Sequence, residues 1–447
     1  MMPHRFHVLK EALWLSWLTA LLLGTVTMHA TAPVNGYELG TPLPGPMAKG
    51  RVPKRTLARP ETCGECHVQE LVKWEASYRP TAFSNSFVQA QYALVWAKAK
   101  AEGTGDALPA SCLACHSPAR YLAGELPAPG SPEAVRGDLG ITCDFCHSTW
   151  GYDGDGPGAS NWVFRKGGNR MGPEIASAVG TRRWNRSPEL CGTCHDERGP
   201  GSQWVKASYI EWKAGPSVKD AKKGCLDCHT FSRQHLDGLI AGAASLVIHP
   251  PKAGVRAGQR VSIAVDVRNE KAGHPMPGSS NELRQLWLHV EALDTHGKVH
   301  PLSVQPKGIP GEEATIGSDA LAYQDAGELS GEANFAGLAR DGEGIAPGDR
   351  LFRLPMYDAK GRMTAFEWNA ASIGNDYRLP ARETVAEIFL LNFPADFPQG
   401  PLALRATLRY RRVPPALWAY LKLPKDGNPS ILVTQAVGTL TVLPSSP

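Results

Sequence analysis

The pattern of hydrophobic and polar positions divides the chain into two halves. From about residue 245 onward, apolar and polar residues alternate with a period of two, as expected for strands with one buried face. The clearest examples are residues 261–267, 286–290, 402–408 and 431–434, and residues 385–393 form a more continuous apolar run. Turns rich in Gly and Pro separate these segments. The pattern predicts an antiparallel β-sandwich domain over residues 245–447, with about seven or more strands.

The first half lacks this alternation and favours short helices between loops. Residues 68–77 are compatible with a helix, and residues 86–101 carry an apolar stripe that includes Phe87, Tyr92 and Val95. The whole chain of 447 residues contains 46 Gly and 37 Pro, which favours a loop-rich fold. We therefore expect a loop-rich, mainly α domain over residues 61–244.

The N-terminus has the pattern of an export signal. In residues 1–32 a basic start precedes an apolar stretch from Ala12 to Val26, and the small residues Ala30 and Ala32 follow. A cleaved signal peptide and an uncleaved membrane anchor both remain open, although the apolar stretch is short for a bilayer span. Residues 33–60, rich in Gly and Pro, are interpreted as a linker. Either reading predicts a periplasmic or other extracytoplasmic location.

The pattern Cys-x-x-Cys-His occurs five times between residues 61 and 244 and uses every cysteine of the chain. The cysteines are Cys63 and Cys66, Cys112 and Cys115, Cys143 and Cys146, Cys191 and Cys194, and Cys225 and Cys228. The histidines that follow them are His67, His116, His147, His195 and His229.

This spacing is the attachment signature of c-type haem. On a helical turn, residues i and i+3 share a face, so two thiols can form thioether bonds with the two vinyl groups of one porphyrin. The histidine at i+4 can then take the proximal position on the iron. A structural zinc site uses Cys-x-x-Cys units in pairs, and a redox dithiol is expected once, so neither accounts for five units each followed by histidine. The sequence predicts five c-type haems.

Five haems change the expected packing and charge of the protein. Residues 61–244 are too few to surround each porphyrin separately, so the haems should stack closely and form much of the core. Their ten propionates would bring the formal charge of +4 to about −6. The sequence contains no basic run that would indicate nucleic-acid binding.

The residues around the motifs resemble the multihaem cytochrome c family. That family includes the tetrahaem cytochrome c-554 of ammonia oxidisers and is related to hydroxylamine oxidoreductase and pentahaem nitrite reductase. The resemblance rests on the segments 61–67, 140–147, 189–196, 209–212 and 224–229, and on a Gly-His-x-x-Pro element at His274.

Three departures from the family pattern bear on function. Relatives often carry a distal histidine after the first Trp-x-x-Ser, where this chain has Tyr78 and Arg79, and another ahead of the fourth motif, where it has Arg182-Arg183-Trp184. Pentahaem nitrite reductases typically replace one motif histidine with lysine, whereas all five motifs here end in histidine. This difference argues against nitrite reduction by that route.

Five irons need five distal ligands if every site is closed. The resemblance suggests His235, just after the last motif, and we expect His274 to reach a haem from a loop between two strands. His249, His289, His296 and His300 are better explained as structural or surface residues, and Met171 and Met276 as packing residues. The chain thus offers fewer evident distal ligands than haems.

The main hypothesis is an exported pentahaem electron carrier between a quinol-linked donor or soluble cytochrome and a terminal acceptor. The alternative is a multihaem oxidoreductase that acts on a small inorganic nitrogen or sulfur compound at an open iron, with Arg79 holding the anion or else pairing with a haem propionate. A third hypothesis is a structural subunit of a larger redox complex. An electron carrier fits the sequence better than an enzyme.

Overall fold

The structure is a computed structural model that describes residues 57–137, 139–152, 160–164, 186–221, 223–229, 232–280, 283–305, 328–329, 333–334, 345–346 and 348–444. The predicted signal segment 1–32, residues 33–56 of the linker, Met171, Arg182-Arg183-Trp184 and most of residues 308–348 lie outside the described residues. Within the described part of the chain, no helix is both long enough and apolar enough to cross a membrane.

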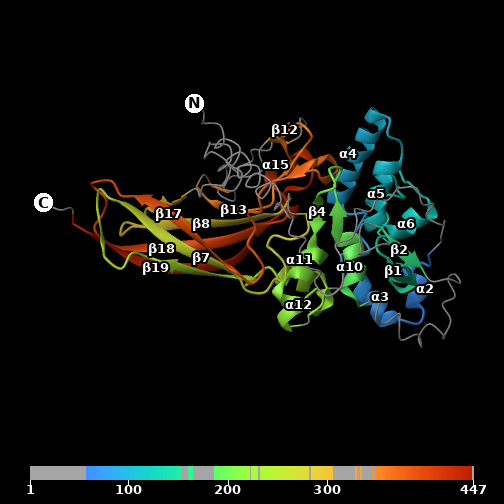
Figure 1. The fold of residues 1–447 in the computed structure, drawn as a ribbon, viewed down its shortest axis with the longest axis horizontal. Helices are drawn as coiled ribbons and strands as arrows, with labels where there is room; N and C mark the ends of the chain where they lie inside the picture. Colours follow the sequence, from blue (N-terminus) through green and yellow to red (C-terminus); the bar gives the residue numbers. More distant parts are fainter. Residues whose placement is uncertain are drawn as a thin grey trace, which may run out of the picture.

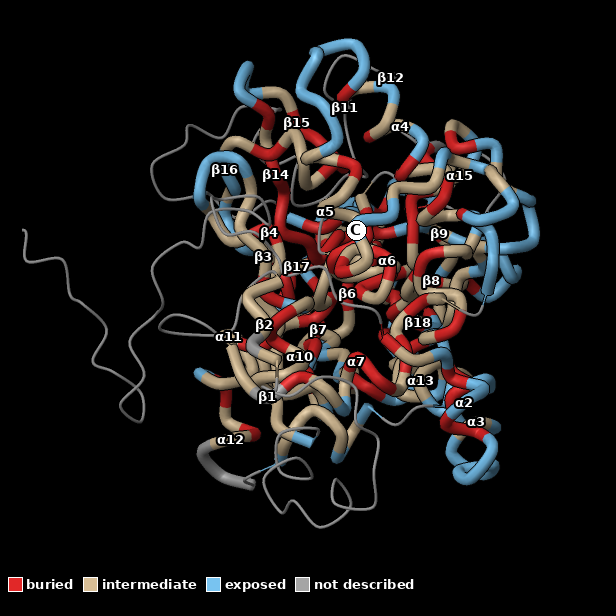
Figure 2. Tube along the Cα trace, turned by 90° about the vertical axis from the view of Figure 1, so that its right-hand side faces the viewer, coloured by how far each residue is buried: buried red, intermediate tan, exposed pale blue. Residues whose placement is uncertain are grey.

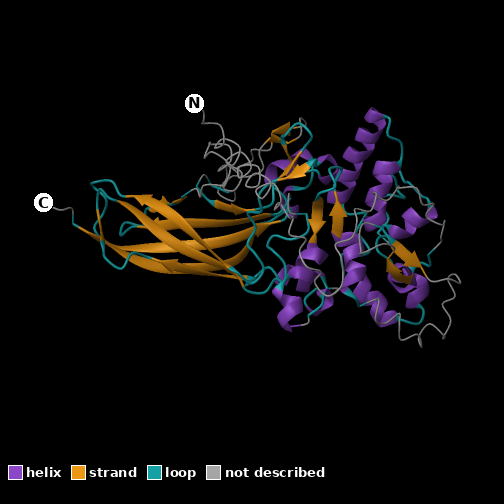
Figure 3. Cartoon of the chain, in the orientation of Figure 1, coloured by secondary structure: helices purple, strands orange, loops and turns teal. Residues whose placement is uncertain are grey.

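The first part of the described chain is a helical region of short elements (Figures 1 and 3). Its helices are α2 (Pro60–Gly64), α3 (Val68–Glu75), α4 (Ser86–Glu102), α5 (Ala107–His116), α6 (Pro118–Ala123), α7 (Cys143–Ser148), α10 (Pro188–His195), α11 (Ser208–Ala214), α12 (Pro216–Ala221), α13 (Arg233–Gly238) and the 3₁₀ turn η1 (Cys225–Asp227). Two hairpins interrupt them, β1 (Thr149–Tyr152) with β2 (Trp162–Phe164), and β3 (Asp196–Arg198) with β4 (Trp204–Ala207).

Both helices expected in this region are present. The helix predicted at 68–77 is α3, and the one predicted at 86–101 is α4. The longer helix α4 begins where the Asn85 side chain accepts a hydrogen bond from the Val88 amide at 2.9 Å, and it ends at Gly103, which has a φ of 63°. An N-cap asparagine and a left-handed glycine satisfy backbone groups that the helix ends leave free, so local sequence sets both boundaries.

The second part is a strand-rich region in which two sheets are the largest. One sheet has the order β10-β17-β7-β5, and the other has the order β13-β8-β18-β19-β6 with β9 beside β8. The strands are β5 (Ala244–His249), β6 (Val255–Arg256), β7 (Arg260–Asn269), β8 (Gln285–Leu293), β9 (Val299–Pro301), β10 (Ser303–Val304), β13 (Arg350–Phe352), β17 (Thr384–Asn392), β18 (Gly400–Arg411) and β19 (Ile431–Leu443). All five strand segments expected from the sequence are present, in β7, β8, β17, β18 and β19.

The strand-rich region has one hydrophobic core to which both sheets contribute. Ile263 and Phe389 come from the first sheet, Leu288 and Leu404 from the second, and all four are fully buried. Figure 2 shows that buried segments gather in the interior of the molecule and exposed segments at its periphery. The expectation of purely antiparallel pairing is wrong at one edge, because β6 pairs with β19 in parallel. Strand β6 has only two residues, so it is too short to show the alternation of apolar and polar positions by which longer strands are recognised in a sequence.

A hydrophobic contact joins the helical and strand-rich regions. Helix α4 packs on α15 (Pro415–Tyr420), a short helix that follows β18, and the rings of Phe87 and Trp418 stack with centroids 5.9 Å apart. Leu417 is fully buried in the same cluster. Because large aromatic side chains bury much apolar area, this contact contributes substantially to holding the two regions together.

Polar contacts complete this boundary at two further places. The guanidinium of Arg378 donates to both carboxylate oxygens of Glu211 in α11 and to Asp376. Arg412, after β18, donates to the Tyr78 hydroxyl at 2.9 Å and also bonds Asp237. The two regions are thus fixed against each other by both apolar and charged groups.

Candidate haem-binding site

Every Cys-x-x-Cys-His motif lies on a single helical turn. The first motif spans the end of α2, the second and fourth end α5 and α10, the third opens α7, and the fifth occupies η1. In the first motif the His67 amide donates to the Cys63 carbonyl at 2.9 Å, and in the fifth the His229 amide donates to the Cys225 carbonyl at 2.8 Å. This i to i+4 bond places each histidine one turn beyond its first cysteine.

The chemistry of these side chains fits covalent haem. None of the ten cysteines is paired in a disulfide, so all ten are available for thioether formation. Burial lowers the pKa of His116 and His147, and burial together with nearby cationic groups lowers the pKa of His195 to about 4, so these imidazoles are neutral at neutral pH. The Nδ1 of His116 lies 2.8 Å from the Ala82 carbonyl, which orients the ring and leaves Nε2 as the ligand atom.

The first, third and fourth motifs are neighbours in space. Burial, followed by the electrostatic effect of the Cys63 thiol, raises the pKa of Cys143 to about 11. Burial also raises the pKa of Cys146 to about 12, and Cys191 and Cys194 of the fourth motif contribute to that rise. The third motif therefore lies between the first and the fourth.

The second and fifth motifs both adjoin the fourth. A hydrogen bond with Cys194 is the largest cause of the raised pKa of Cys115, and a hydrogen bond with Cys191 is the largest cause of the raised pKa of Cys225. The fourth motif is thus the junction of the array. It connects the first and third motifs on one side with the second and fifth on the other.

A close backbone approach holds the third motif against the chain that follows the first. The Ile141 amide donates to the Arg79 carbonyl at 3.0 Å, and Trp74 Nε1 donates to the Ile141 carbonyl at 2.7 Å. A Cβ atom on Gly140 would lie 2.0 Å from the Arg79 carbonyl oxygen. Glycine is therefore required at position 140 for this contact.

Gly140→Ala is expected to destabilise the protein by about 2–3 kcal/mol, because backbone atoms must move to relieve the overlap. Urea denaturation followed by circular dichroism measures this change. Gly137→Ala is the matched control, since its Cβ would lie 3.7 Å from the nearest atom, an ordinary contact in the same loop. Equal midpoints for the two variants would contradict the assignment.

The structure brings His274 next to the fifth motif. The rings of His274 and His229 lie with centroids 6.3 Å apart and planes 19° from parallel. The Nδ1 atom of His274 lies 2.9 Å from the Pro275 carbonyl oxygen, which leaves its Nε2 available. Close packing fixes the ring, because a Cβ on Gly278 would lie 2.7 Å from it.

The loop that carries His274 is anchored on both sides. It follows β7, where the Asn269 side chain donates to the His274 carbonyl at 3.1 Å. On the helical side, a Cβ on Gly215 would lie 2.5 Å from the Gly273 carbonyl oxygen, so the loop backbone rests directly on the end of α11. His274 lies between β7 and β8, as expected, and its role as a haem ligand stays a prediction.

His235 also lies near the fifth motif, on α13, but its side chain is engaged elsewhere. Its Nε2 atom is 2.9 Å from the Cys228 carbonyl oxygen, and the residue is exposed. Met276 is buried in the core of the strand-rich region, in agreement with a packing role. Of the two histidines that sequence reasoning put forward as distal ligands, His274 therefore has the better placed nitrogen.

Four further histidines lie in the strand-rich region. His249 contacts Asp266 at 2.8 Å, His289 contacts Asp349 at 2.6 Å, and His300 contacts Asp294 at 2.8 Å. The His296 amide bonds Asp294. The side chains of His249, His289 and His300 thus each have a local carboxylate partner, and His296 is bonded through its backbone amide.

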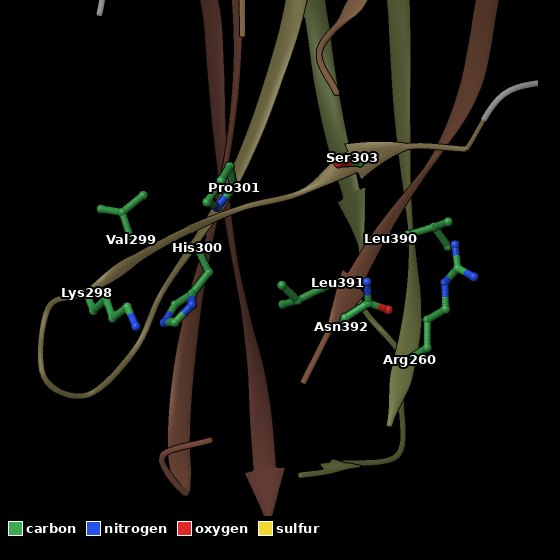
Figure 4. A pocket seen from close by; sticks show the side chains of 9 residues that line it. All are labelled: Arg260, Lys298, Val299, His300, Pro301, Ser303, Leu390, Leu391 and Asn392. Carbon is green, nitrogen blue, oxygen red and sulfur yellow. The ribbon is translucent and has the colours of Figure 1, made fainter. Parts of the chain in front are cut away.

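A pocket of about 400 Å³ lies among β7, β9, β10 and β17 of the strand-rich region (Figure 4). Its lining includes Arg260, Lys298, His300 and Asn392. None of the motif residues contributes to it, so this pocket is separate from the candidate haem site.

Two aspartates that adjoin motif residues brace them, and sequence reasoning assigned them no role. Asp144, inside the third motif, accepts the Ala58 amide at 2.6 Å. Asp196, after the fourth motif, accepts the amides of Tyr209 and Ile210 at 2.8 and 3.1 Å. Both aspartates are almost completely buried. The sequence does not indicate this burial, because most aspartates in proteins are exposed at the surface.

Comparison with known proteins agrees with this geometry. Residues 62–148, which include the first three motifs, match the family model described as cytochrome c554 and c-prime. A penta-heme cytochrome c552 from Thermochromatium tepidum has a similar structure, with a TM-score of 0.55 and 17% identity over 86% of this chain and 99% of that chain. Residues 62–148 therefore resemble the cytochrome c554 family, and the chain shares the fold of that penta-heme cytochrome.

A second structural match adds nothing to this resemblance. AggA, the major subunit of aggregative adherence fimbriae type I from Escherichia coli, aligns with 45% of this chain and 97% of that chain at 11% identity. Its TM-score of 0.19 is too low to carry an argument. No curated protein sequence matches the chain.

Proposed function

We propose that this protein is an exported electron carrier that holds five covalent haems, one at each motif, and moves electrons between redox protein partners. The residues that would hold each haem are the two cysteines and the histidine of its motif. When bound, haem supplies reversible one-electron chemistry. The polypeptide attaches, orients and buries the porphyrins, and thereby sets their potentials.

The observation that carries this proposal is the placement of His274 opposite His229. Two imidazoles bound to opposite faces of one iron, with metal–nitrogen bonds of about 2 Å, have ring centroids roughly 6 Å apart. The observed centroid distance of 6.3 Å agrees with that spacing. We infer that His274 closes the iron of the fifth motif, which favours electron transfer over catalysis at that site.

The contacts between motifs support a continuous electron path. The first motif adjoins the third, the third adjoins the fourth, and the fourth adjoins both the second and the fifth. The order in space therefore differs from the order in sequence. Electrons that enter at the first or second motif would pass the fourth before they reach the fifth.

We infer that the strand-rich region is a β-sandwich that supports this array and supplies His274. An N-terminal signal or membrane anchor would place the protein in the periplasm or another extracytoplasmic space, where its partners would be a quinol-linked donor or soluble cytochrome and a terminal acceptor. These assignments rest on the sequence pattern described above.

The test is the haem content and spin state of the purified holoprotein. We expect five haems per chain and low-spin iron at the fifth motif, measured by pyridine haemochrome assay and quantified low-temperature EPR. Fewer than five haems, or cysteines that remain alkylatable in the holoprotein, would contradict the proposal.

A second candidate function is an oxidoreductase with one open iron. Arg79 favours it, because this partly buried guanidinium lies close enough to Cys143, Cys146 and Cys191 to interact electrostatically with their thiols. There it could hold a small inorganic anion of nitrogen or sulfur, or equally a haem propionate. A stoichiometric high-spin EPR signal that shifts on addition of nitrite, hydroxylamine or sulfite would support this function.

A further inference from the structure

The chain crosses from one sheet to the other beside the pocket of Figure 4. Strand β9 pairs with β8 in the second sheet, and after Leu302 the chain continues as β10, which pairs with β17 in the first sheet. Leu302 is buried, and its amide donates to the Val290 carbonyl at 2.9 Å. The crossing therefore ends the pairing of β10 with β17 at Ser303 and Leu390, before β17 itself ends.

The uncovered end of β17 presents a backbone amide to the pocket. The Phe393 amide donates to the Gln259 carbonyl at 2.9 Å on the β7 side, whereas the Ile388 carbonyl accepts from the Gln305 amide at 2.6 Å on the β10 side. Successive residues of a strand point their backbone groups to opposite edges, so the Asn392 amide points to the β10 side. Strand β10 does not reach this position, so the amide is available to a ligand.

Two cationic side chains lie at opposite ends of the pocket. Figure 4 shows Leu391 and Asn392 between Lys298 on one side and Arg260 on the other. Both charged side chains are exposed, and neither donates a hydrogen bond to another group in the described part of the chain. No aspartate or glutamate is among the residues that line the pocket. The pocket thus has two positive ends that its own lining does not neutralise.

The turn that carries Lys298 is held by the acidic residue Asp294. Only 3% of the Asp294 side chain is exposed. Its Oδ1 atom accepts the His296 and Lys298 amides at 2.8 and 3.0 Å, and its Oδ2 atom lies 2.8 Å from His300 Nε2. The His300 ring also packs on Phe397 with centroids 4.7 Å apart. The turn is therefore formed without a ligand, which reduces the entropy that binding would cost.

We propose that this pocket binds a small organic dicarboxylate, with one carboxylate at Lys298 and the Asn392 backbone amide and the other at Arg260. Ammonium, guanidinium and backbone N–H groups all donate charge-assisted hydrogen bonds to carboxylates. Val299 and Leu391 in the lining suit a hydrocarbon chain between the two carboxylates. The volume of about 400 Å³ lies within the range of small-molecule sites, roughly 300–1,000 Å³. This binding function goes beyond the proposed electron transfer.

The test is isothermal titration calorimetry of the holoprotein with succinate, glutarate and adipate, which differ in the length of the chain between their carboxylates. We expect saturable binding of at least one of them. Butyrate should bind about tenfold more weakly, because it leaves one cation without a partner. Lys298→Gln and Arg260→Gln should each weaken the binding of the best dicarboxylate by about tenfold for the same reason.

Arg268→Gln is the matched control. Arg268 lies near the other end of β7, is 47% exposed and pairs with Glu270, so its variant removes the same charge from the same strand outside the pocket. Its affinity should equal that of the wild type. The inference is overturned if none of the three dicarboxylates binds, if butyrate or inorganic phosphate binds as tightly, or if either pocket variant keeps full affinity. Haem content tests the proposed function separately, because no motif residue lines the pocket.

Discussion

Replacing His274 with alanine is expected to convert one haem iron from six-coordinate low-spin to five-coordinate high-spin. The ring centroids of His274 and His229 are 6.3 Å apart. No other histidine ring in the described part of the chain is paired with the ring of His229 in this way. Loss of a strong-field ligand leaves the iron with its proximal histidine alone or with water. Quantified EPR should show one high-spin iron per chain and unchanged signals from the other haems.

Two variants serve as controls for this result. His300→Ala removes a histidine that bonds Asp294 in the strand-rich region and should leave every spin state unchanged. His235→Ala removes the alternative ligand near the fifth motif. Added imidazole should restore the low-spin signal of His274→Ala. A high-spin signal in His235→Ala, together with an unchanged spectrum in His274→Ala, would assign the ligand to His235 instead.

Features that depend on neighbouring residues could be predicted from the sequence. The helical turns of the five motifs follow from the i, i+3, i+4 spacing, and α4 follows from its apolar stripe with Asn85 and Gly103 at its ends. The strands β7, β8, β17, β18 and β19 follow from apolar periodicity. His274 was placed correctly between two strands because the pattern showed where each strand stops.

Features that depend on the tertiary arrangement could not be predicted. The fourth motif is the junction of the array, yet its contacts with Cys115 and Cys225 leave no trace in the spacing of the motifs. Glu367 lies far from Lys206 in the sequence, and single charged residues are common at surfaces, so their ion pair had no signal. The sequence also gave no signal for the helix α15, because it is a short segment between two strands.

The boundary between the two regions is more than a structural contact. His274 crosses it toward the fifth motif, and Glu367 crosses it toward Lys206 on β4. The strand-rich region thus contributes one ligand candidate and one charge to the helical region. A change in how the two regions fit would therefore alter the haems as well as the stability.

Arg378→Met is expected to destabilise this boundary by about 3 kcal/mol. Only 3% of the Arg378 side chain is exposed, and it donates to Glu211 on α11 and to Asp376 at the same time. Removing the guanidinium leaves the Glu211 carboxylate, which is 16% exposed, without its buried counter-charge. Removing one partner of a buried ion pair lowers the free energy of unfolding by about 3–5 kcal/mol. Because the two carboxylates are partly exposed, we expect the loss for Arg378→Met at the lower end of this range.

Urea denaturation of the holoprotein followed by far-UV circular dichroism measures this loss. Arg268→Met is the matched control, because Arg268 forms an ion pair with Glu270 at 3.3 Å in which the two side chains are 47% and 39% exposed, and both residues lie in the strand-rich region. Exposed pairs contribute at most about 1 kcal/mol, so this control should shift the midpoint little. If the two variants shift it equally, the Arg378–Glu211 pair does not hold the regions together. If Arg378→Met alone also alters the spin state of the fifth haem, the pair positions the His274 loop.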